Sequence, residues 1–242
     1  LSGSGLYEGG LGRVSGGIVY YTCLLKRNTG SSRTPEEITR LLSEQLQADV
    51  QKLQELSGRY RQLTGHTPDS ASTLFPFPIE DAQEILTDLQ QRMQDDFPPL
   101  SALTDTPVSC TVRTVSESLQ SYTSPAFYLT PPLDALSENV IYINQSQMND
   151  DLTLFTTLAH EGYPGHLYQT VYYESTDPDP LRSIFNFGGY IEGWATYAEM
   201  GSYYLMPLSK EQSTLLQKNN SIILGLYALA DMGIHYDGWN RM

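Results

Sequence analysis

The spacing of apolar residues changes twice along this chain, and these changes constrain its fold most strongly. After Thr34–Glu37, apolar side chains recur at helical spacing to about Thr64, and Gly65 ends the pattern. Within Thr34–Glu37, a threonine caps the helix, a proline suits the first helical position, and two glutamates complement the positive end of the helix dipole. The sequence therefore predicts a long amphipathic helix over residues 34–64.

Shorter elements surround this helix. Alternating and β-branched residues in the middle of the chain predict two or three strands, within residues 108–115, 126–129 and 139–144. Helical patterns on either side predict helices over residues 16–28, 80–95, 152–173, 189–205 and 209–236. The last of these opens on Ser209-Lys-Glu-Gln212, which is typical of a capping box. We therefore expect a mostly α protein of the α+β class, with a helical body and a small β-sheet in one domain over residues 1–242. The glycine-rich residues 1–15 are expected to form a loose arm.

The net charge excludes several kinds of partner. The 28 acidic residues outnumber the 14 Lys and Arg residues, so the formal net charge is −14. Such a chain repels phosphate backbones and anionic lipid surfaces, and its apolar runs are far shorter than the ~20 residues that cross a bilayer. We expect no nucleic-acid partner and no transmembrane segment. Cys23 and Cys110 lack metal-ligand spacing, and two buried free thiols are favoured over a disulfide.

The charges are unevenly distributed along the chain. From Thr114 to Leu181 there is no Lys or Arg, whereas nine Asp or Glu residues occur, and His160 and His166 lie within this stretch. Paired histidines in an acidic, cation-poor segment are typical of a divalent metal site. A solvated acidic surface is the alternative interpretation.

The two histidines are separated by an unusual number of residues. The familiar zinc-peptidase pattern His-Glu-x-x-His places two imidazoles one helical turn apart, with the glutamate beside the metal-bound water. Here His166 follows His160 by six residues. On a regular helix at ~100° per residue, the two side chains would lie about 120° apart and would not share a metal ion.

A proline and a glycine between the histidines change this geometry. Pro164 has no N–H for the helical hydrogen bond and its ring clashes with the preceding turn, while Gly165 tolerates unusual dihedral angles. A bulge or wide turn here would return His166 to the face of His160. The alternative is a plain helix end at Tyr163, with a second helix that begins at Pro164.

A third metal ligand is available further along the chain. Glu192 and Glu199 are seven residues apart, which is nearly two helical turns, so both lie on one face of their helix. The surrounding residues are largely apolar. Two interpretations are open. One of the two glutamates binds a metal ion and the other supports a neighbouring ligand, or both are simply solvated surface acids.

Two segments resemble a known family. The residues His-Glu-Gly-Tyr-Pro-Gly-His-Leu-Tyr-Gln at 160–169 and Glu-Gly-Trp-Ala-Thr-Tyr-Ala-Glu at 192–199 are similar to the bacterial domain-of-unknown-function 885 family, which is regarded as related to the gluzincin metallopeptidases. Lesser matches occur at Tyr20-Tyr21, Thr29-Gly30, Thr34–Glu37, Tyr128–Pro132, Tyr142–Asn144 and Asp231–His235. Members of that family are longer, so we expect this chain to be an incomplete member.

The resemblance implies a fold, a metal and a set of roles. It implies a gluzincin-like arrangement in which the small sheet lies next to the zinc-motif helix, with Zn²⁺ held by His160, His166 and Glu192 and with Glu161 as general base. Two imidazoles and one carboxylate leave a position open for water, as catalytic zinc requires. Glu199 remains an alternative third ligand or a partner of one.

Two weaker expectations concern other parts of the chain. By analogy with gluzincins, His235 would stabilise a tetrahedral oxyanion, although Asp231 lies four residues before it and a structural hydrogen bond is the plainer interpretation. The strand Val140–Ile143 would hold an extended peptide by backbone pairing if it lies at a sheet edge. A core strand is the alternative.

These observations predict a zinc-dependent metallopeptidase with a peptide substrate. The alternative is a catalytically silent, surface-attached binding module of the same fold. A carboxylate-bridged di-iron bundle is disfavoured because neither Glu192 nor Glu199 has a histidine three residues later. The acidic composition and the frequent export of the family indicate a secreted or lipid-anchored protein.

Overall fold

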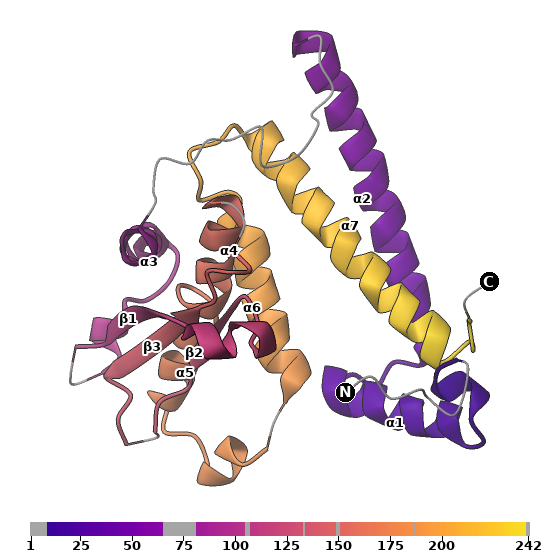
Figure 1. The fold of residues 1–242 in the computed structure, drawn as a ribbon, viewed down its shortest axis with the longest axis horizontal. Coiled ribbons are helices and arrows are strands. Elements are labelled where there is room, and N and C mark those ends of the chain that lie inside the picture. Colours follow the sequence, from indigo (N-terminus) through magenta and orange to yellow (C-terminus); the bar gives the residue numbers. More distant parts are fainter. Residues whose placement is uncertain are drawn as a thin grey trace. The chain divides into compact units, whose positions relative to one another are not determined.

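Helices make up most of the structure, a computed structural model, and its strands form one small sheet (Figure 1). The structure describes residues 9–64, 81–104, 107–132, 134–148, 151–185 and 187–240. The mostly α, α+β class predicted from the sequence is confirmed.

The chain divides into two compact units, which are described separately below. The helical unit comprises Leu1–Thr67, Phe187–Tyr190 and Thr214–Met242, and the sheet unit comprises Pro68–Asn186 and Ile191–Ser213. The described residues of the helical unit form three α-helices: α1 (Gly17–Thr29), α2 (Pro35–Thr64) and most of α7 (Lys210–His235).

Hydrogen-bonded caps fix the starts of the two long helices. Glu37 accepts a hydrogen bond from the Thr34 backbone N–H at 2.7 Å, and its own N–H donates to the Thr34 hydroxyl at 3.3 Å. Ser209 and Gln212 form the same reciprocal pair at the start of α7. Each pair satisfies two N–H groups that a helix start leaves free, which is why these short sequence patterns predicted α2 and α7 well.

A buried carboxylate joins α2 to α7 within the helical unit. Asp49 of α2 is only 1% exposed. Its carboxylate contacts Lys218 Nζ at 2.7 Å and accepts hydrogen bonds from Ser221 at 2.6 Å and Gln45 at 2.9 Å. Burial raises the pKa of Asp49, but the hydrogen bonds from Lys218, Ser221 and Gln45 outweigh it, so the pKa is below its usual value.

The first described residues are also held in place. Leu11–Arg13 form a 3-10 turn. The Leu11 backbone N–H donates to His235 Nδ1 at 3.2 Å, and Arg13 donates to the Gly238 carbonyl at 2.7 Å. Within the predicted loose arm, residues 11–13 are therefore ordered by specific contacts with His235 at the end of α7 and with Gly238 beyond it. Residues 1–8 lie outside the described part.

The sheet unit contains three strands in the order β1-β3-β2. β3 (Glu138–Ile143) pairs in parallel with β1 (Ser109–Thr114) and antiparallel with β2 (Ala126–Leu129). The strand at Val140–Ile143 is therefore central, so the core-strand alternative holds and the condition for pairing with a peptide, a position at the sheet edge, is not met. Both of its sides already carry a ladder of hydrogen bonds.

The described residues of the sheet unit also form four helices: α3 (Ala82–Arg92), α4 (Asp151–Glu161), α5 (His166–Glu174) and the greater part of α6 (Gly188–Ser202). The shorter turns are 3-10 helices at Met93–Asp95, Leu100–Ala102, Glu117–Tyr122 and Pro180–Ser183. Side chains from these helices and from β3 form a fully buried core, which includes Ile85, Leu89, Ile141, Phe155, Leu158, Leu167 and Val171. This core fixes α4 and α5, which carry the two histidines.

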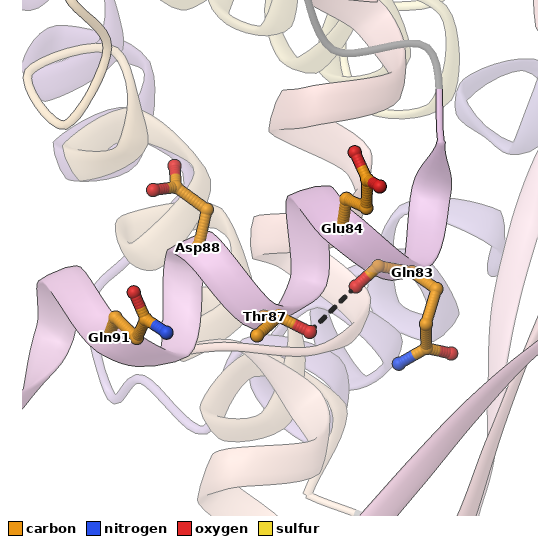
Figure 2. Close-up of a pocket in the computed structure, with 5 residues that line it drawn as sticks. All are labelled: Gln83, Glu84, Thr87, Asp88 and Gln91. Carbon is orange, nitrogen blue, oxygen red and sulfur yellow. Dashed lines mark hydrogen bonds between the residues drawn. The ribbon is translucent and has the colours of Figure 1, made fainter.

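A shallow pocket lies on the exposed side of α3 (Figure 2). Its lining is polar and consists of Gln83, Glu84, Thr87, Asp88 and Gln91. Gln83 also covers the outer edge of β1: its amide nitrogen donates to the Cys110 carbonyl at 3.1 Å, and its amide oxygen accepts from the Val112 N–H at 3.0 Å. One side chain thus satisfies edge groups that another strand would otherwise pair with. The pocket contains no histidine or cysteine.

Two other sequence expectations concern the whole chain. Both cysteines are free thiols, as favoured, but neither is buried as expected: Cys23 is exposed and Cys110 is half-buried. Among the residues that the structure describes, we find no helix with the length and apolar character needed to cross a membrane.

We predict that Asp49→Asn lowers the free energy of unfolding by about 3 kcal/mol at pH 7, because it leaves the Lys218 ammonium without its buried partner. The folded-state pKa of Asp49 is depressed, so its contribution is fully present above about pH 4, near the pKa of an unfolded Asp. It is lost as the pH falls through the folded-state pKa. Urea unfolding of both proteins between pH 7 and pH 3 measures this difference.

A surface variant provides the control for this prediction. Glu44 pairs with Arg40 at 2.8 Å, but both side chains are about 60% exposed. We expect Glu44→Gln to change the stability by less than about 0.5 kcal/mol, as for other exposed i,i+4 pairs. Equal effects of the two substitutions would contradict the role assigned to Asp49.

Candidate metal centre

A four-residue turn joins the helices that carry the two histidines. α4 ends at Glu161, the turn spans Gly162–Gly165, and α5 begins at His166. The backbone therefore leaves the helix in a wide turn, and this turn returns His166 to His160, as predicted from Pro164 and Gly165. The alternative boundaries, a helix end at Tyr163 and a new helix at Pro164, are wrong. The imidazole centroids lie 4.8 Å apart, with the rings nearly perpendicular.

Gly165 allows this close return of the chain. A Cβ at this position would lie 1.8 Å from the His160 carbonyl oxygen and 2.4 Å from that of Ala159. These atoms belong to the backbone and have no flexible side chain that can move aside. The last turn of α4 and the first residue of α5 thus approach each other only because residue 165 has no side chain.

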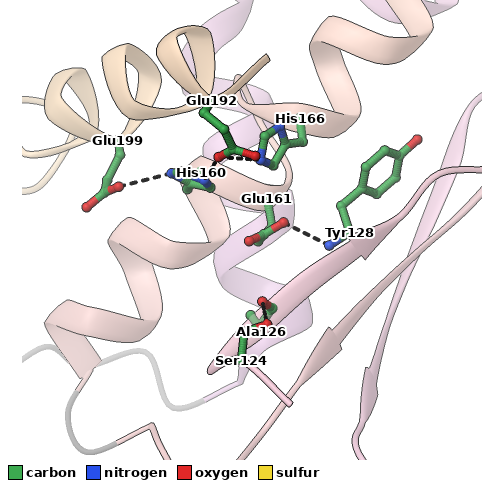
Figure 3. A network of polar contacts seen from close by, with 8 residues as sticks. All are labelled: Ser124, Ala126, Tyr128, His160, Glu161, His166, Glu192 and Glu199. Carbon is green, nitrogen blue, oxygen red and sulfur yellow. Dashed lines mark hydrogen bonds and ion pairs between the residues drawn. The ribbon is translucent and has the colours of Figure 1, made fainter. Parts of the chain in front are cut away.

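The two imidazoles meet a carboxylate from α6 (Figure 3). The Nε2 atoms of His160 and His166 each lie 3.6 Å from the same oxygen, Oε2 of Glu192. One ligand atom from each of these three residues lies within 4.8 Å of the others. The histidines are mostly buried, whereas the Glu192 side chain is 64% exposed, so the cluster is open to solvent on the side of Glu192.

Glu199 contacts the opposite nitrogen of His160. Its Oε2 lies 3.0 Å from His160 Nδ1. With the proton on Nδ1 donated to Glu199, Nε2 presents its lone pair toward Glu192 and His166. The two glutamates of one α6 face thus lie beside the two different nitrogens of one imidazole, Glu199 in a hydrogen bond and Glu192 at 3.6 Å. The geometry favours Glu192 over Glu199 as the ligand that faces both histidines.

Burial and charge shift the pKa values of both histidines. Burial alone lowers the pKa of His160, but the hydrogen bond to Glu199 and the charges of Glu161, Glu199 and Glu192 outweigh it and raise the pKa. Burial and the neighbouring His160 lower the pKa of His166. The two imidazoles therefore differ in their affinity for a proton, with the positive charge favoured on His160.

Glu161 points toward the sheet rather than toward α6 (Figure 3). Its Oε2 accepts a hydrogen bond from the Tyr128 backbone N–H of β2 at 2.8 Å. Burial raises the pKa of the Glu161 carboxyl, and the charge of His160 and this hydrogen bond only partly counteract the increase. A carboxylate that is fixed by a backbone amide and made more basic by burial suits proton transfer. The sequence contains no local signal for this partner, since a backbone N–H carries no residue identity.

His235 belongs to the helical unit, where several contacts hold it. Its ring stacks on Tyr21 with centroids 5.7 Å apart, and its Nε2 lies 3.8 Å from Asp231 Oδ1. The Tyr21 hydroxyl donates to the other oxygen of Asp231 at 2.6 Å. At 3.8 Å the Asp231–His235 hydrogen bond expected as the plainer alternative is not formed; the His235 ring instead accepts a hydrogen bond from the Leu11 N–H. The oxyanion role of His235 stays a prediction.

The fold and this site define a mostly helical α+β protein with a candidate two-histidine, one-carboxylate metal centre. The family model described as Bacterial protein of unknown function (DUF885) matches residues 11–242. The chain belongs to this family, as its two motif segments predicted. No curated protein matches the chain.

A solved structure supports the fold. The putative lipoprotein from Colwellia psychrerythraea is similar over 96% of this chain, with a TM-score of 0.67 and 22% sequence identity. The similar region covers 42% of that protein, so this chain spans less than half of its length. At this identity the likeness concerns the fold alone.

We predict that Gly165→Ala lowers the free energy of unfolding by at least about 2 kcal/mol, because the new methyl group overlaps the backbone of α4. The same displacement moves His166 away from His160. Urea unfolding measures the first effect, and titration with zinc measures the second as weaker binding.

Gly193→Ala is the matched control for this substitution. Gly193 lies inside α6, next to Glu192, and a Cβ there meets no atom within 4 Å. Since alanine is the better helix former, we expect this variant to be as stable as the parent or more stable by about 0.5–1 kcal/mol. Unchanged stability in Gly165→Ala would contradict the role assigned to Gly165.

Proposed function

We propose that this chain is the zinc-binding part of a metallopeptidase that hydrolyses peptide bonds. One observation carries the proposal: two imidazole Nε2 atoms lie 3.6 Å from one oxygen of Glu192, while Glu199 holds the opposite nitrogen of His160. Histidine ligands of metals typically give their second nitrogen to a carboxylate in this way.

The donor set fits zinc chemically. Two neutral imidazoles and one carboxylate are the ligands of many hydrolytic zinc sites, and they leave a coordination position open. The exposed side of Glu192 provides access to that position. In this proposal His160, His166 and Glu192 hold the ion, and Glu199 orients His160. Bound zinc supplies a Lewis acid that polarises a carbonyl group and makes water more acidic.

Glu161 is the proposed general base. The Tyr128 N–H holds its Oε2, so the carboxylate keeps one orientation and its other oxygen is the one that accepts a proton from the attacking water. After the proton has been accepted, the carboxyl group donates it to the leaving amine of the peptide. Burial, which raises the pKa of Glu161, favours both steps near neutral pH.

We also infer that the protein acts outside the cytoplasm, either secreted or lipid-anchored. The description of the Colwellia protein as a lipoprotein supports this location. A peptide is the proposed substrate, and the activity of a longer protein containing this chain is part of the same proposal.

We predict that Glu161→Gln retains zinc and loses peptide hydrolysis by a factor of about 10²–10⁴, because the amide cannot accept the proton. The measurements are zinc content by elemental analysis and cleavage of a peptide library by mass spectrometry. Glu84→Gln, an exposed carboxylate change on α3, is the control and should keep both. A parent protein without tightly bound zinc would instead support the metal-free binding module.

Glu199→Gln should act differently from Glu161→Gln. The amide accepts a hydrogen bond from His160 Nδ1 less strongly than a carboxylate does, so we expect the zinc affinity to fall about 10- to 100-fold. Competition with a chromophoric chelator measures this change. An affinity equal to that of the parent would contradict the role of Glu199 as the partner of His160.

A further inference from the structure

The turn Gly162–Gly165 determines whether the two imidazoles meet Glu192. The turn connects α4 and α5, whereas Glu192 lies on α6. The core packs α4 and α5 together. The distance of 3.6 Å from each Nε2 to Glu192 also requires that α6 keeps a fixed position relative to the turn. A direct hydrogen bond between α6 and the turn would fix this position.

Trp194 makes such a bond. Its indole Nε1–H donates to the Pro164 carbonyl oxygen at 2.7 Å. Trp194 lies two residues after Glu192 on α6, and Pro164 lies two residues before His166. One hydrogen bond therefore links the helix that carries Glu192 to the turn between the two histidines.

The bond satisfies a carbonyl group that the turn removes from the helical pattern. Inside the turn region, the Gly162 carbonyl accepts from Tyr168 N–H at 3.2 Å, and the Gly165 carbonyl accepts from Gln169 N–H at 2.9 Å. Pro164 is buried, so its carbonyl needs a partner from another element. Trp194 supplies that partner with the single donor that its side chain has.

Aromatic packing holds the indole in position. Phe97 contacts Trp194 edge-on at a centroid distance of 6.1 Å, and it also contacts Tyr168 of α5 edge-on at 5.6 Å. The Tyr168 hydroxyl donates to the Pro98 carbonyl at 3.0 Å. The indole is thus packed against Phe97, which itself packs on Tyr168 of α5, while the indole N–H is directed at Pro164.

We propose that Trp194 is a positioning residue of the metal centre: its N–H sets the distance between Glu192 and the two histidines. The inference rests on the proposed zinc site. It assigns to the indole N–H a role separate from the packing of the ring, because Phe97 contacts the ring and Pro164 contacts the N–H.

Trp194→Phe tests the proposal, since phenylalanine keeps an aromatic ring against Phe97 and removes the N–H. We expect the affinity for zinc, measured by chelator competition, to fall about tenfold, which corresponds to the loss of one well-made hydrogen bond. We also expect the visible spectrum of the cobalt-substituted protein to change, because it reports the geometry of the ligands. The far-UV circular dichroism should equal that of the parent.

Two aromatic variants are matched controls. Trp239→Phe makes the same substitution at an exposed tryptophan of the helical unit, and Tyr197→Phe alters an exposed ring on α6 that itself contacts Trp194. Both should keep the zinc affinity and the cobalt spectrum of the parent. Replacement of Trp194 by benzothienylalanine, which preserves the ring shape without the N–H, should reproduce Trp194→Phe even where the smaller ring disturbs folding.

The outcomes separate this inference from the proposed function. A parent that binds zinc, with an unchanged affinity and cobalt spectrum in Trp194→Phe or in the benzothienylalanine protein, would overturn the role of Trp194 and leave the metal site intact. A parent that binds neither zinc nor cobalt would overturn both. Weaker binding in all variants, including Trp239→Phe, would also overturn the specific role of the Trp194 N–H.

Discussion

The convergence of two imidazoles on one carboxylate is the constraint on which the candidate site depends. His160 lies in the last turn of α4 and His166 opens α5, so their separation is decided by the four-residue turn Gly162–Gly165 that joins the two helices. Gly165 permits the contact because a side chain there would overlap the His160 carbonyl. Glu192 then needs only one oxygen to face both Nε2 atoms. A small backbone feature thus determines whether these side chains form a site, and the buried core behind α4 and α5 keeps that feature rigid.

The helical unit depends on a different kind of interaction. Its two long helices run in opposite directions, with Thr39 near Met232 at one end and Asp49 near Lys218 further along. A buried ion pair with additional hydrogen bonds fixes this register more specifically than apolar contacts do, because a shift by one turn would remove Lys218 and Ser221 from the Asp49 carboxylate. The buried ion pair between Asp49 and Lys218 therefore aligns the two long helices of the helical unit.

The sequence predicted those parts of the structure that depend on neighbours along one element. The caps at Thr34 and Ser209 and the shared face of Glu192 and Glu199 were predicted because each depends on local helical geometry. The position of His166 was left open, since helical angles do not extend through a turn. The bonds from Tyr128 to Glu161 and from Trp194 to Pro164 join residues that are 33 and 30 positions apart, and no local pattern signals them. The central position of Val140–Ile143 depends on strand order, which spacing does not reveal.

The charges around the site favour a cation at its centre. Three carboxylates, Glu161, Glu192 and Glu199, act on His160 and raise its pKa, although burial alone would lower it. The segment from Thr114 to Leu181 offers no lysine or arginine to balance these carboxylates. Protonation of His160 compensates only one negative charge, and it consumes the lone pair that faces Glu192. A divalent ion between the two Nε2 atoms and Glu192 would balance more charge and leave the bond to Glu199 intact, so the same field that raises the pKa of His160 favours metal binding.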